Sequence, residues 1–304
     1  MVFPRLFIVI VNWNLKNDLL ACIDSLLVAG AETRQIIVVD NNSTDHSIDA
    51  VHSRYGRALT TLMAKENLGF AKGNNWGIRH ALAQDAEWVL LLNNDTVVAP
   101  DMLFALRKAT QQHPEYSIFS PLVFYFDQPT TIWSAGDRLI PGTLATYHIY
   151  HKKQLNKHIP DILDVDFVTG CGILINRAVF CEVGLLDTST FMYAEEVDFI
   201  WRARMFGHKV ACATEARMWH KVSMSSKQDQ PKTRYLRIRN QIWFYRKYAQ
   251  GTQMPIMFGF VLLRLLMKGI ADIIAQRPTL ISPLVRGWKD GWVTDLSAVR
   301  PADD

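Results

Sequence analysis

Four short runs of β-branched and aliphatic residues, alternating with segments of helical spacing, constrain the fold of this chain most. The apolar runs cover residues 6–11, 36–39, 58–63 and 88–92, and helical spacing covers residues 16–29 and 70–83. Apolar runs without polar alternation are typical of strands buried on both faces. Strands that alternate with helices predict βαβ units, and therefore an α/β protein with a mostly parallel sheet.

Polar residues end three of these strands. Asn12 follows the first strand, Asp40 ends the second, and Asn93-Asn94-Asp95 ends the fourth. Because ligands bind outside the carboxyl ends of parallel strands, we expect these side chains to converge on one crevice. The first strand is followed by neither G-x-G-x-x-G nor a Walker A sequence, which disfavours a dinucleotide-binding dehydrogenase and a P-loop NTPase.

Composition excludes several classes of protein. Hydrophobic residues make up 49% and charged residues 20% of the 304 residues, which excludes a disordered or fibrous chain. The four cysteines lie far apart without C-x-x-C spacing, which argues against a zinc site or a disulfide framework and favours a reducing cytoplasm. Residues 6–11 are too short for the apolar part of a secretory signal, so we expect no leader of this kind.

Charge is concentrated toward the end of the chain. From Lys221 onward there are 14 basic and 6 acidic residues, against 19 and 23 before it, so this region is expected to meet an anionic partner. Within it, residues 254–275 are strongly apolar, with Arg264, Lys268 and Asp272 on one helical face. This pattern favours an interfacial helix near anionic head groups, over packing of its apolar face on the protein body or a true membrane span.

Asp95 and the 195–198 cluster are candidates for chemistry. Asp95, beside amide side chains at a strand end, suits a hard cation such as Mg²⁺ or Mn²⁺, although Asn-Asn-Asp is also good turn chemistry. Three carboxylates, Glu195, Glu196 and Asp198, begin a helix, where acids also favour the helix dipole. Their apolar flank, residues 191–193, predicts a desolvated carboxylate with a raised pKa, which makes a better general base.

Two further features have both a structural and a functional interpretation. His220 follows a tryptophan and is a packed residue unless another element places it beside Asp95. The Asn- and Gly-rich segment 67–77 is either a capped turn or backbone that approaches a ligand at a helix N-terminus.

Taken in order, the motifs resemble those of the inverting family-2 glycosyltransferases with the GT-A fold. The nearest subgroup is similar to bacterial rhamnosyltransferases of cell-surface polysaccharide synthesis, O antigen included. The matching segments are Val9-Ile10-Val11-Asn12-Trp13-Asn14, residues 38–45, Asn67-Leu68-Gly69-Phe70-Ala71, residues 91–96, Trp133-Ser134-Ala135-Gly136, residues 168–172, residues 195–198 with Trp201-Arg202, and Trp219-His220-Lys221.

The resemblance implies a domain organisation. Residues 1–225 would form a GT-A domain with a nucleotide-sugar half at about 1–115 and an acceptor half at about 116–225. Residues 226–304 would form a helical, basic and amphipathic extension close to a membrane.

The resemblance also implies residue roles. Glu196 would be the catalytic base, in place of the family's usual Asp, and Asp95 and His220 would hold Mg²⁺ or Mn²⁺, with Asn93 replacing the other acid of the D-x-D motif. The implied nucleotide-binding residues are Asn12, Asp40, Asn42, Asn67, Gly69, Asn75 and Asn94. The implied acceptor-binding or motif-supporting residues are Trp133, Gly170, Glu195, Asp198 and Arg202.

The implied activity is transfer of a sugar, L-rhamnose from dTDP-rhamnose as first choice, to a glycan or polyprenyl-linked acceptor. UDP-linked galactofuranose, galactose or N-acetylglucosamine are the alternative donors. The resemblance implies that the protein is cytoplasmic and binds peripherally to the anionic inner face of the membrane. No nucleic acid partner is expected.

Two other classes of function fit the sequence less well. A sugar nucleotidyltransferase would need a Gly-rich, basic loop after the first strand, where this chain has Asn12-Trp13-Asn14. A non-catalytic nucleotide-sugar or glycan-binding module would have no need of Asp95, Glu196 and His220 together; metal-dependent donor hydrolysis would exclude it.

Overall fold

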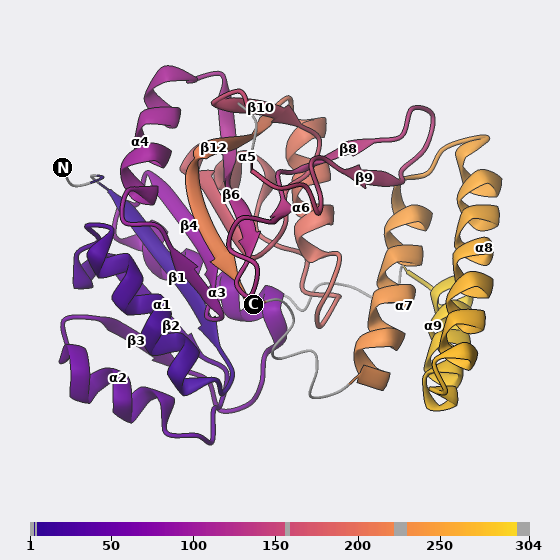
Figure 1. Ribbon diagram of the computed structural model, residues 1–304, viewed down its shortest axis with the longest axis horizontal. Coiled ribbons are helices and arrows are strands. Elements are labelled where there is room, and N and C mark those ends of the chain that lie inside the picture. Colours follow the sequence, from indigo (N-terminus) through magenta and orange to yellow (C-terminus); the bar gives the residue numbers. More distant parts are fainter. Residues whose placement is uncertain (1–2, 4, 156–158, 222–229, 297–304) are drawn as a thin grey trace.

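An α/β body with three helices beside it makes up the computed structural model (Figure 1). The structure describes residues 3, 5–155, 159–221 and 230–296. The predicted boundary between residues 225 and 226 falls outside the described residues. The body is built on one sheet in the order β10-β12-β6-β11-β4-β1-β2-β3, and β5 and β7 pair with β12 and β6.

The first half of the body confirms the predicted βαβ pattern. Its elements are β1 (Leu6–Asn12), α1 (Lys16–Val28), η1 (Thr33–Gln35), β2 (Ile36–Asp40), α2 (Ser47–Tyr55), β3 (Thr60–Met63), α3 (Gly69–Ala83) and β4 (Trp88–Asn93). The four strands are parallel. Asn12 lies opposite Asp40, and Val11 lies opposite Asn93, so the polar strand ends meet at one edge as predicted.

The second half makes the sheet mixed. It adds β5 (Thr96–Val98), α4 (Met102–Gln112), β6 (Tyr116–Tyr125), β7 (Ile132–Ser134), β8 (Asp137–Leu139), β9 (Thr146–His148), β10 (Ile162–Val165), β11 (Gly172–Asn176), α5 (Arg177–Val183), α6 (Glu195–Met205) and β12 (Lys209–His220). Strand β11 runs antiparallel between β4 and β6. Strand β12 runs parallel to β6, and this pairing brings His220 back to the edge where β4 ends.

Both faces of the sheet are buried, which explains the continuous apolar runs. Val9 and Ile37 belong to a core on one face, which includes residues of α3, α6 and α7. Ile8 and Val38, their neighbours along the strands, belong to a second core on the other face, with residues of α1, α2 and α4. Alternate side chains of one strand therefore fill two different cores.

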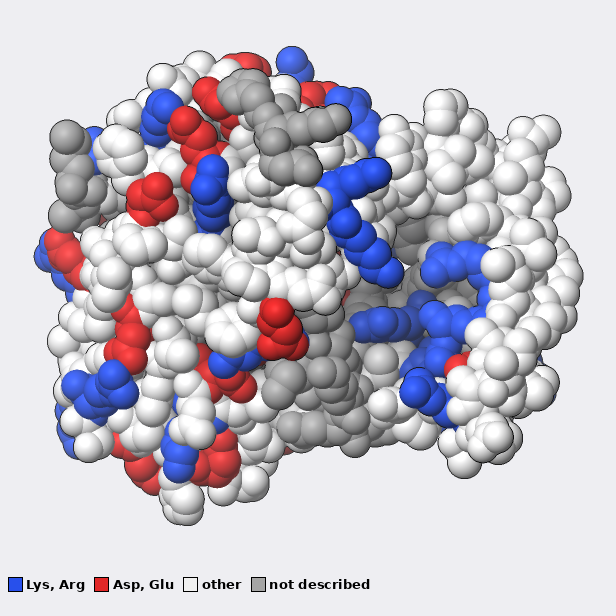
Figure 2. All heavy atoms as spheres, in the orientation of Figure 1, with Lys and Arg blue, Asp and Glu red and all other residues white. Residues whose placement is uncertain are grey.

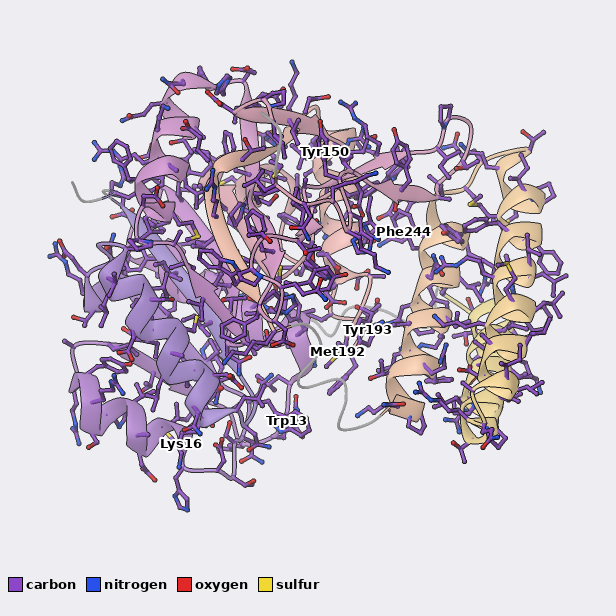
Figure 3. All side chains as sticks on the ribbon, in the orientation of Figure 1. Trp13, Lys16, Tyr150, Met192, Tyr193 and Phe244 are labelled. Atoms are coloured by element: carbon purple, nitrogen blue, oxygen red, sulfur yellow. The ribbon has the colours of Figure 1, made fainter. Side chains whose placement is uncertain are left out.

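Three helices follow the body: α7 (Gln230–Tyr248), α8 (Gln253–Ile274) and α9 (Ile281–Val293), with η3 (Pro278–Leu280) before α9. Asn240 on α7 donates to the main-chain carbonyls of Met192 and Tyr193, at 2.8 and 3.0 Å, which ties the helices to the body. Figure 3 shows Met192 and Tyr193 in this position between the body and α7. None of the helices in the described ranges combines the length and the apolar content that a membrane span requires.

The orientation of α8 differs from what its pattern suggested. Arg264 and Asp272 face α7, where Arg264 donates to Gln241 at 3.5 Å and Asp272 pairs with Arg234 at 3.0 Å. Most of its apolar side chains are instead exposed: Ile256, Phe258, Leu262, Leu263, Leu266, Met267, Ile270, Ile273 and Ile274. The alternative that α8 packs its apolar face on the body is therefore wrong for most of its length, because the charged face is the one turned inward.

Candidate active site

Buried amides and a carboxylate form a network beneath the crevice at the carboxyl ends of β1, β2 and β4. Asn12 donates from its amide nitrogen to Asp40 at 3.2 Å and to Ser43 at 3.0 Å. Its amide oxygen accepts from Asn94 at 2.7 Å, and Asp40 also accepts from the Ser43 main chain at 3.0 Å. Since these groups are buried and paired with one another, they hold Asn94 in a single orientation.

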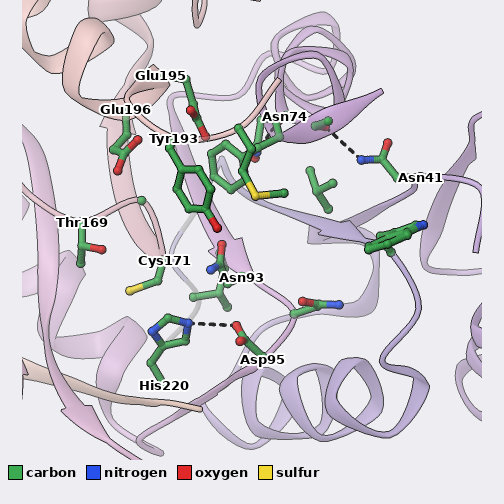
Figure 4. Close-up of a pocket in the computed structure, with 18 of the residues that line it drawn as sticks. Asn41, Asn74, Asn93, Asp95, Thr169, Cys171, Tyr193, Glu195, Glu196 and His220 are labelled. Atoms are coloured by element: carbon green, nitrogen blue, oxygen red, sulfur yellow. Dashed lines mark hydrogen bonds and ion pairs between the residues drawn. The ribbon is translucent and has the colours of Figure 1, made fainter. Parts of the chain in front are cut away.

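A cavity of about 320 Å³ opens above this network and brings together most of the predicted site. The predicted residues that line it are Asn67, Gly69, Asn94, Asp95, Trp133, Gly170, Glu195, Glu196 and His220. Figure 4 shows the two glutamates on one side of this cavity, opposite the Asp95–His220 pair. Residues from β1 through β12 therefore meet at one place.

The Asn-Leu-Gly turn forms one wall of the cavity. Gly69 has a φ of +77°, and a Cβ there would lie 2.4 Å from the main-chain oxygen of Phe191, so only glycine fits. The Gly69 N–H donates to the Asn67 side chain at 2.9 Å, and the next N–H, of Phe70, donates to Phe191 at 3.0 Å. These contacts bind the start of α3 to the segment that precedes α6.

Six predicted site residues do not line the cavity. Asn12 and Asp40 lie beneath it in the network described above, and Asn42 is exposed at a φ of +61° in the turn after β2. Asn75 is buried, and its amide bonds both main-chain groups of Leu186, at 2.9 and 3.1 Å.

The last two, Asp198 and Arg202, join α6 to its neighbours. Asp198 accepts from Arg202 at 2.8 Å, and from Lys247 and Tyr248 of α7 at 2.7 Å. Arg202 also donates to the main-chain carbonyls of residues 183 and 185. The side chains of both residues are thus engaged in holding α6, the helix that begins with the glutamates.

Asp95 and His220 meet although they lie far apart in the sequence. Strand β5 pairs with β12 so that Thr96 lies opposite His220, which places Nε2 of His220 3.0 Å from Oδ1 of Asp95. Both residues are buried, and the Trp133 ring packs edge-on against the imidazole with centroids 4.9 Å apart. His220 therefore lies beside Asp95, which is the position that makes it a candidate metal ligand.

The environment of His220 stabilises a positive charge on its ring. Burial lowers its pKa, but the Cys171 sulfur and the Asp95 carboxylate outweigh burial and raise the pKa to about 10. Neither ring nitrogen makes a well-aligned hydrogen bond to the described residues. A positive charge is thus stabilised beside Asp95, and a metal ion binding there would displace a proton.

The donor set fits Mg²⁺ or Mn²⁺. Neighbouring ligands of an octahedral ion with bonds of about 2.1 Å lie roughly 3 Å apart, and the carboxylate and imidazole atoms here are 3.0 Å apart. No group of three or more His, Cys, Asp or Glu side chains in the described ranges is arranged to hold a metal. Two protein ligands leave the remaining positions to water and substrate phosphates, as is usual for Mg²⁺.

Glu195 and Glu196 begin α6 directly after a strained turn. Tyr193 and Ala194 both have a φ of +75°, a conformation that costs free energy in residues other than glycine and is found at functional sites. Burial raises the pKa of both glutamates; Glu196 adds to the rise at Glu195, and Asp137 adds to the rise at Glu196, where Arg237 opposes it. A carboxylate so placed is a stronger base than one in water.

A second cavity of about 410 Å³ adjoins the first. Trp133, Thr169, Tyr193, Glu196 and Arg237 line both cavities. The second also includes residues of β8, β9 and α8, among them Asp137, His148 and Arg264. Much of its lining, between Trp133 and Val197, comes from the part of the chain that the resemblance assigns to the acceptor.

Several lining residues were not singled out from the sequence. Trp13 and Cys171 lie inside the quoted motifs, and Tyr193 flanks the glutamates, so position next to a motif could have found them. Asp137 and His148, 2.6 Å apart, and Arg237 have no comparable signal, because pairing of β8 with β9 and the packing of α7 bring them in.

Sequence comparison relates this chain to glycosyltransferases. Residues 7–184, more than half of the chain, match the family described as Glycosyl transferase family 2. The low-salt glycan biosynthesis hexosyltransferase Agl10 of Haloferax volcanii is 29% identical over 66% of this chain and 61% of its own length. The N-acetylglucosaminyl-diphospho-decaprenol L-rhamnosyltransferase of Mycobacterium tuberculosis is 26% identical over 67% and 72%.

A third relative, the galactofuranosyltransferase GlfT1 of Mycobacterium tuberculosis, is 25% identical over 63% of this chain and 62% of its own length. The chain thus spans about three fifths of the length of two of these relatives.

Solved structures share the fold. The mannosyltransferase PcManGT from Pyrobaculum calidifontis, in complex with GDP-Man and Mn²⁺, superposes with a TM-score of 0.58 at 14% identity, covering 97% of this chain and 89% of that one. GalNAc-T7 with UDP, GalNAc and Mn²⁺ superposes with a TM-score of 0.52 at 15% identity, covering 71% and 43%. With the family match, the mixed sheet and the cavity at its carboxyl edge, the chain belongs to glycosyl transferase family 2 and its body has the GT-A fold.

Proposed function

We propose that this protein is an inverting glycosyltransferase in which Glu196 is the general base. The observation that supports this most is that Glu196 lines both cavities. A base for glycosyl transfer must reach an acceptor hydroxyl on one side while the sugar's anomeric carbon lies on the other. Glu196 is the one carboxylate shared by the two cavities within the described part of the chain.

The first cavity is proposed as the donor site. Asn94 lines this cavity and would face the ribose, Asn12 and Asp40 would act from beneath it through their hydrogen-bond network, and Asn67 and Gly69 shape the wall. Asn42, also predicted from the family, would act from the turn after β2, whereas the Asn75 side chain within α3 is bonded to the Leu186 main chain and would support the site from outside the cavity.

Asp95 and His220 would hold Mg²⁺ or Mn²⁺. The ion, when bound, would neutralise charge on the diphosphate leaving group.

The reaction follows from this placement. Glu196, deprotonated, takes the proton of the acceptor hydroxyl as the hydroxyl oxygen attacks the anomeric carbon. The bond from that carbon to the nucleoside diphosphate breaks on the opposite face, so one displacement inverts the centre and no covalent sugar–enzyme bond forms. The general base of such a step contributes about 10² to 10⁴ in rate. Trp133 and Tyr193, at the junction of the cavities, would cover the apolar faces of the sugar.

L-Rhamnose carried on dTDP is proposed as the donor, with UDP-linked galactofuranose, galactose or N-acetylglucosamine as alternatives. A rhamnosyltransferase and a galactofuranosyltransferase are both among the relatives, which supports these choices. We expect a screen of dTDP- and UDP-sugars with Mg²⁺ and with Mn²⁺ to show metal-dependent release of one nucleoside diphosphate. Nucleotide binding without hydrolysis or transfer of any donor would instead support a non-catalytic binding module.

A glycan or polyprenyl-linked acceptor is proposed, used at the cytoplasmic face of the membrane for cell-surface polysaccharide synthesis. The apolar side chains along the outside of α8 support attachment to a membrane surface. Because Arg264 and Lys268 lie on the inward face, apolar insertion would contribute more to attachment than these two charges.

Flotation with liposomes tests this attachment. We expect the protein to float with anionic vesicles, and Leu266→Glu with Ile270→Glu to abolish flotation, because these exposed side chains would lose their apolar contact with lipid. Val28→Glu with Met63→Glu, two apolar positions on the body that are slightly more exposed, is the matched control and should float. Raising salt should weaken flotation less than the α8 change does. Wild type that stays at the bottom, or equal loss in the control, would contradict membrane attachment by α8.

A further inference from the structure

Four basic side chains face one another across α7 and α8. Arg234 and Arg237 lie one turn apart on α7, and Arg264 and Lys268 lie one turn apart on α8. Figure 2 shows Lys and Arg gathered around a hollow between the body and the helices, while the outer side of the helices has almost none. The basic excess of the chain's last third is therefore directed partly inward, toward the substrate cavities.

Among the described residues these cations outnumber the anions near them, which are Asp272 beside Arg234 and Lys268 and Glu196 near Arg237. Arg234 pairs with Asp272 at 3.0 Å, and its other terminal nitrogen is buried with no hydrogen-bond partner in the part of the chain that the structure describes. Within the described ranges Arg264 makes a 3.5 Å hydrogen bond to Gln241 and contacts the Phe260 ring. Arg237 lies over the Tyr193 ring at 4.5 Å.

The electrostatic consequence is visible at Lys268. Burial lowers its pKa, and the charges of Arg234, Arg264 and Arg237 lower it further, against an opposing effect of Asp272. Like charges held together at this density cost free energy unless an anion joins them. A cluster of this kind is a site for a ligand with several negative charges.

The position of the cluster identifies the substrate that would supply those charges. Arg237 and Arg264 line the second cavity, where Glu196 faces the acceptor. The donor's diphosphate is accounted for elsewhere, beside Asp95 and His220, which line the first cavity and not the second. An anion bound by the cluster would therefore belong to the acceptor.

We propose that Arg237 and Arg264, which line the second cavity, bind a diphosphate group of the acceptor behind the apolar face of α8, and that Arg234 and Lys268 beside them add positive charge to this site. This inference rests on the proposed function, since it assumes that the second cavity receives an acceptor. The diphosphate could be attached to a lipid or belong to a soluble phosphorylated acceptor. If the acceptor is lipid-linked, the aromatic side chains that line this cavity, Phe244 and Phe260, would contact the part of the lipid chain nearest the diphosphate.

Calorimetry on the full chain in EDTA tests the site, because without metal the probes have no ion at Asp95 and His220 to bind. The probes are inorganic pyrophosphate and geranyl diphosphate, and geraniol serves as the uncharged control. We expect both diphosphates to bind the wild type in the presence of excess dTDP, and geraniol not to bind. Arg264→Gln with Lys268→Gln should weaken diphosphate binding at least tenfold, because two of the four charges are lost.

Two further variants serve as controls for the loss of charge. Arg264→Lys with Lys268→Arg retains both charges and should bind within about threefold of wild type. Arg277→Gln removes an exposed arginine just beyond α8 that lines neither cavity, and should bind as wild type does. Absence of binding to the wild type, displacement of the probes by dTDP, or equal weakening in Arg277→Gln would each overturn the proposal.

The two probes separate the sources of the diphosphate. Tighter binding of geranyl diphosphate than of pyrophosphate supports a lipid-linked acceptor, and equal binding supports a soluble phosphorylated one. Failure of this site is distinguishable from failure of the proposed function. If the protein hydrolyses a donor but binds neither probe, the proposed function stands and the acceptor site is wrong. If it binds both probes but hydrolyses no donor, the anion site stands and the proposed function is wrong.

Discussion

Glu196→Gln is expected to lower sugar transfer at least 100-fold while nucleotide binding stays within a few-fold of wild type. Glutamine keeps the shape and one hydrogen-bond acceptor but cannot take a proton, and a general base contributes about 10² to 10⁴ in rate. Steady-state transfer assays and nucleotide titration measure the two effects separately. Because burial raises the pKa of Glu196, wild-type activity should fall on acidification at a higher pH than an exposed glutamate would impose.

Glu195→Gln is the matched control, since Glu195 is the neighbouring buried glutamate and lines only the first cavity. It should affect transfer much less than the change at Glu196. Turnover of Glu196→Gln above about a tenth of the wild-type rate would rule out Glu196 as the base. Glu195 and Asp198 would then be the carboxylates to test next.

Asp95→Ala and His220→Ala are expected to weaken nucleoside diphosphate binding at least tenfold when Mg²⁺ or Mn²⁺ is present. In EDTA the same changes should have little effect, because both side chains would act on the nucleotide through the ion. Their 3.0 Å separation and burial support one shared ion. Calorimetry with dTDP and with UDP, each with metal and with EDTA, measures the difference.

The control is Asp101→Ala, an exposed aspartate before α4 that lines neither cavity. It should bind nucleotide as wild type does under both conditions. An equal loss with metal and with EDTA in the Asp95 and His220 variants would show that the pair supports the structure of the site and does not hold an ion.

The fold and the edge of the sheet that bears the cavity could be predicted from local pattern. Apolar runs at β1, β2 and β4 with helices between them are enough to imply parallel strands, and parallel strands place Asn12, Asp40 and Asp95 at one edge. The motif order then added Glu196 and His220, both of which line the predicted crevice.

Residue type alone was less informative about how each side chain is used. Asn75 and Asp198 look like ligand-binding groups in the sequence, but the first bonds the Leu186 main chain and the second joins α6 to α7. Amides and carboxylates satisfy buried main-chain and charged groups as readily as they bind ligands. Which use applies depends on partners distant in the sequence.

The sequence by itself determined which elements form, since strand and helix periodicity, turn glycines such as Gly69 and polar strand ends are local properties. Only the tertiary structure decided which face of α8 is turned inward, because a helical period groups Arg264 with Lys268 but is the same whichever way the helix is rotated. It also decided that Arg237 and Glu196 line the same cavities and that Asp95 meets His220 across 125 residues of chain. The packing of α7 and the pairing of β5 with β12 are long-range contacts that no local pattern encodes.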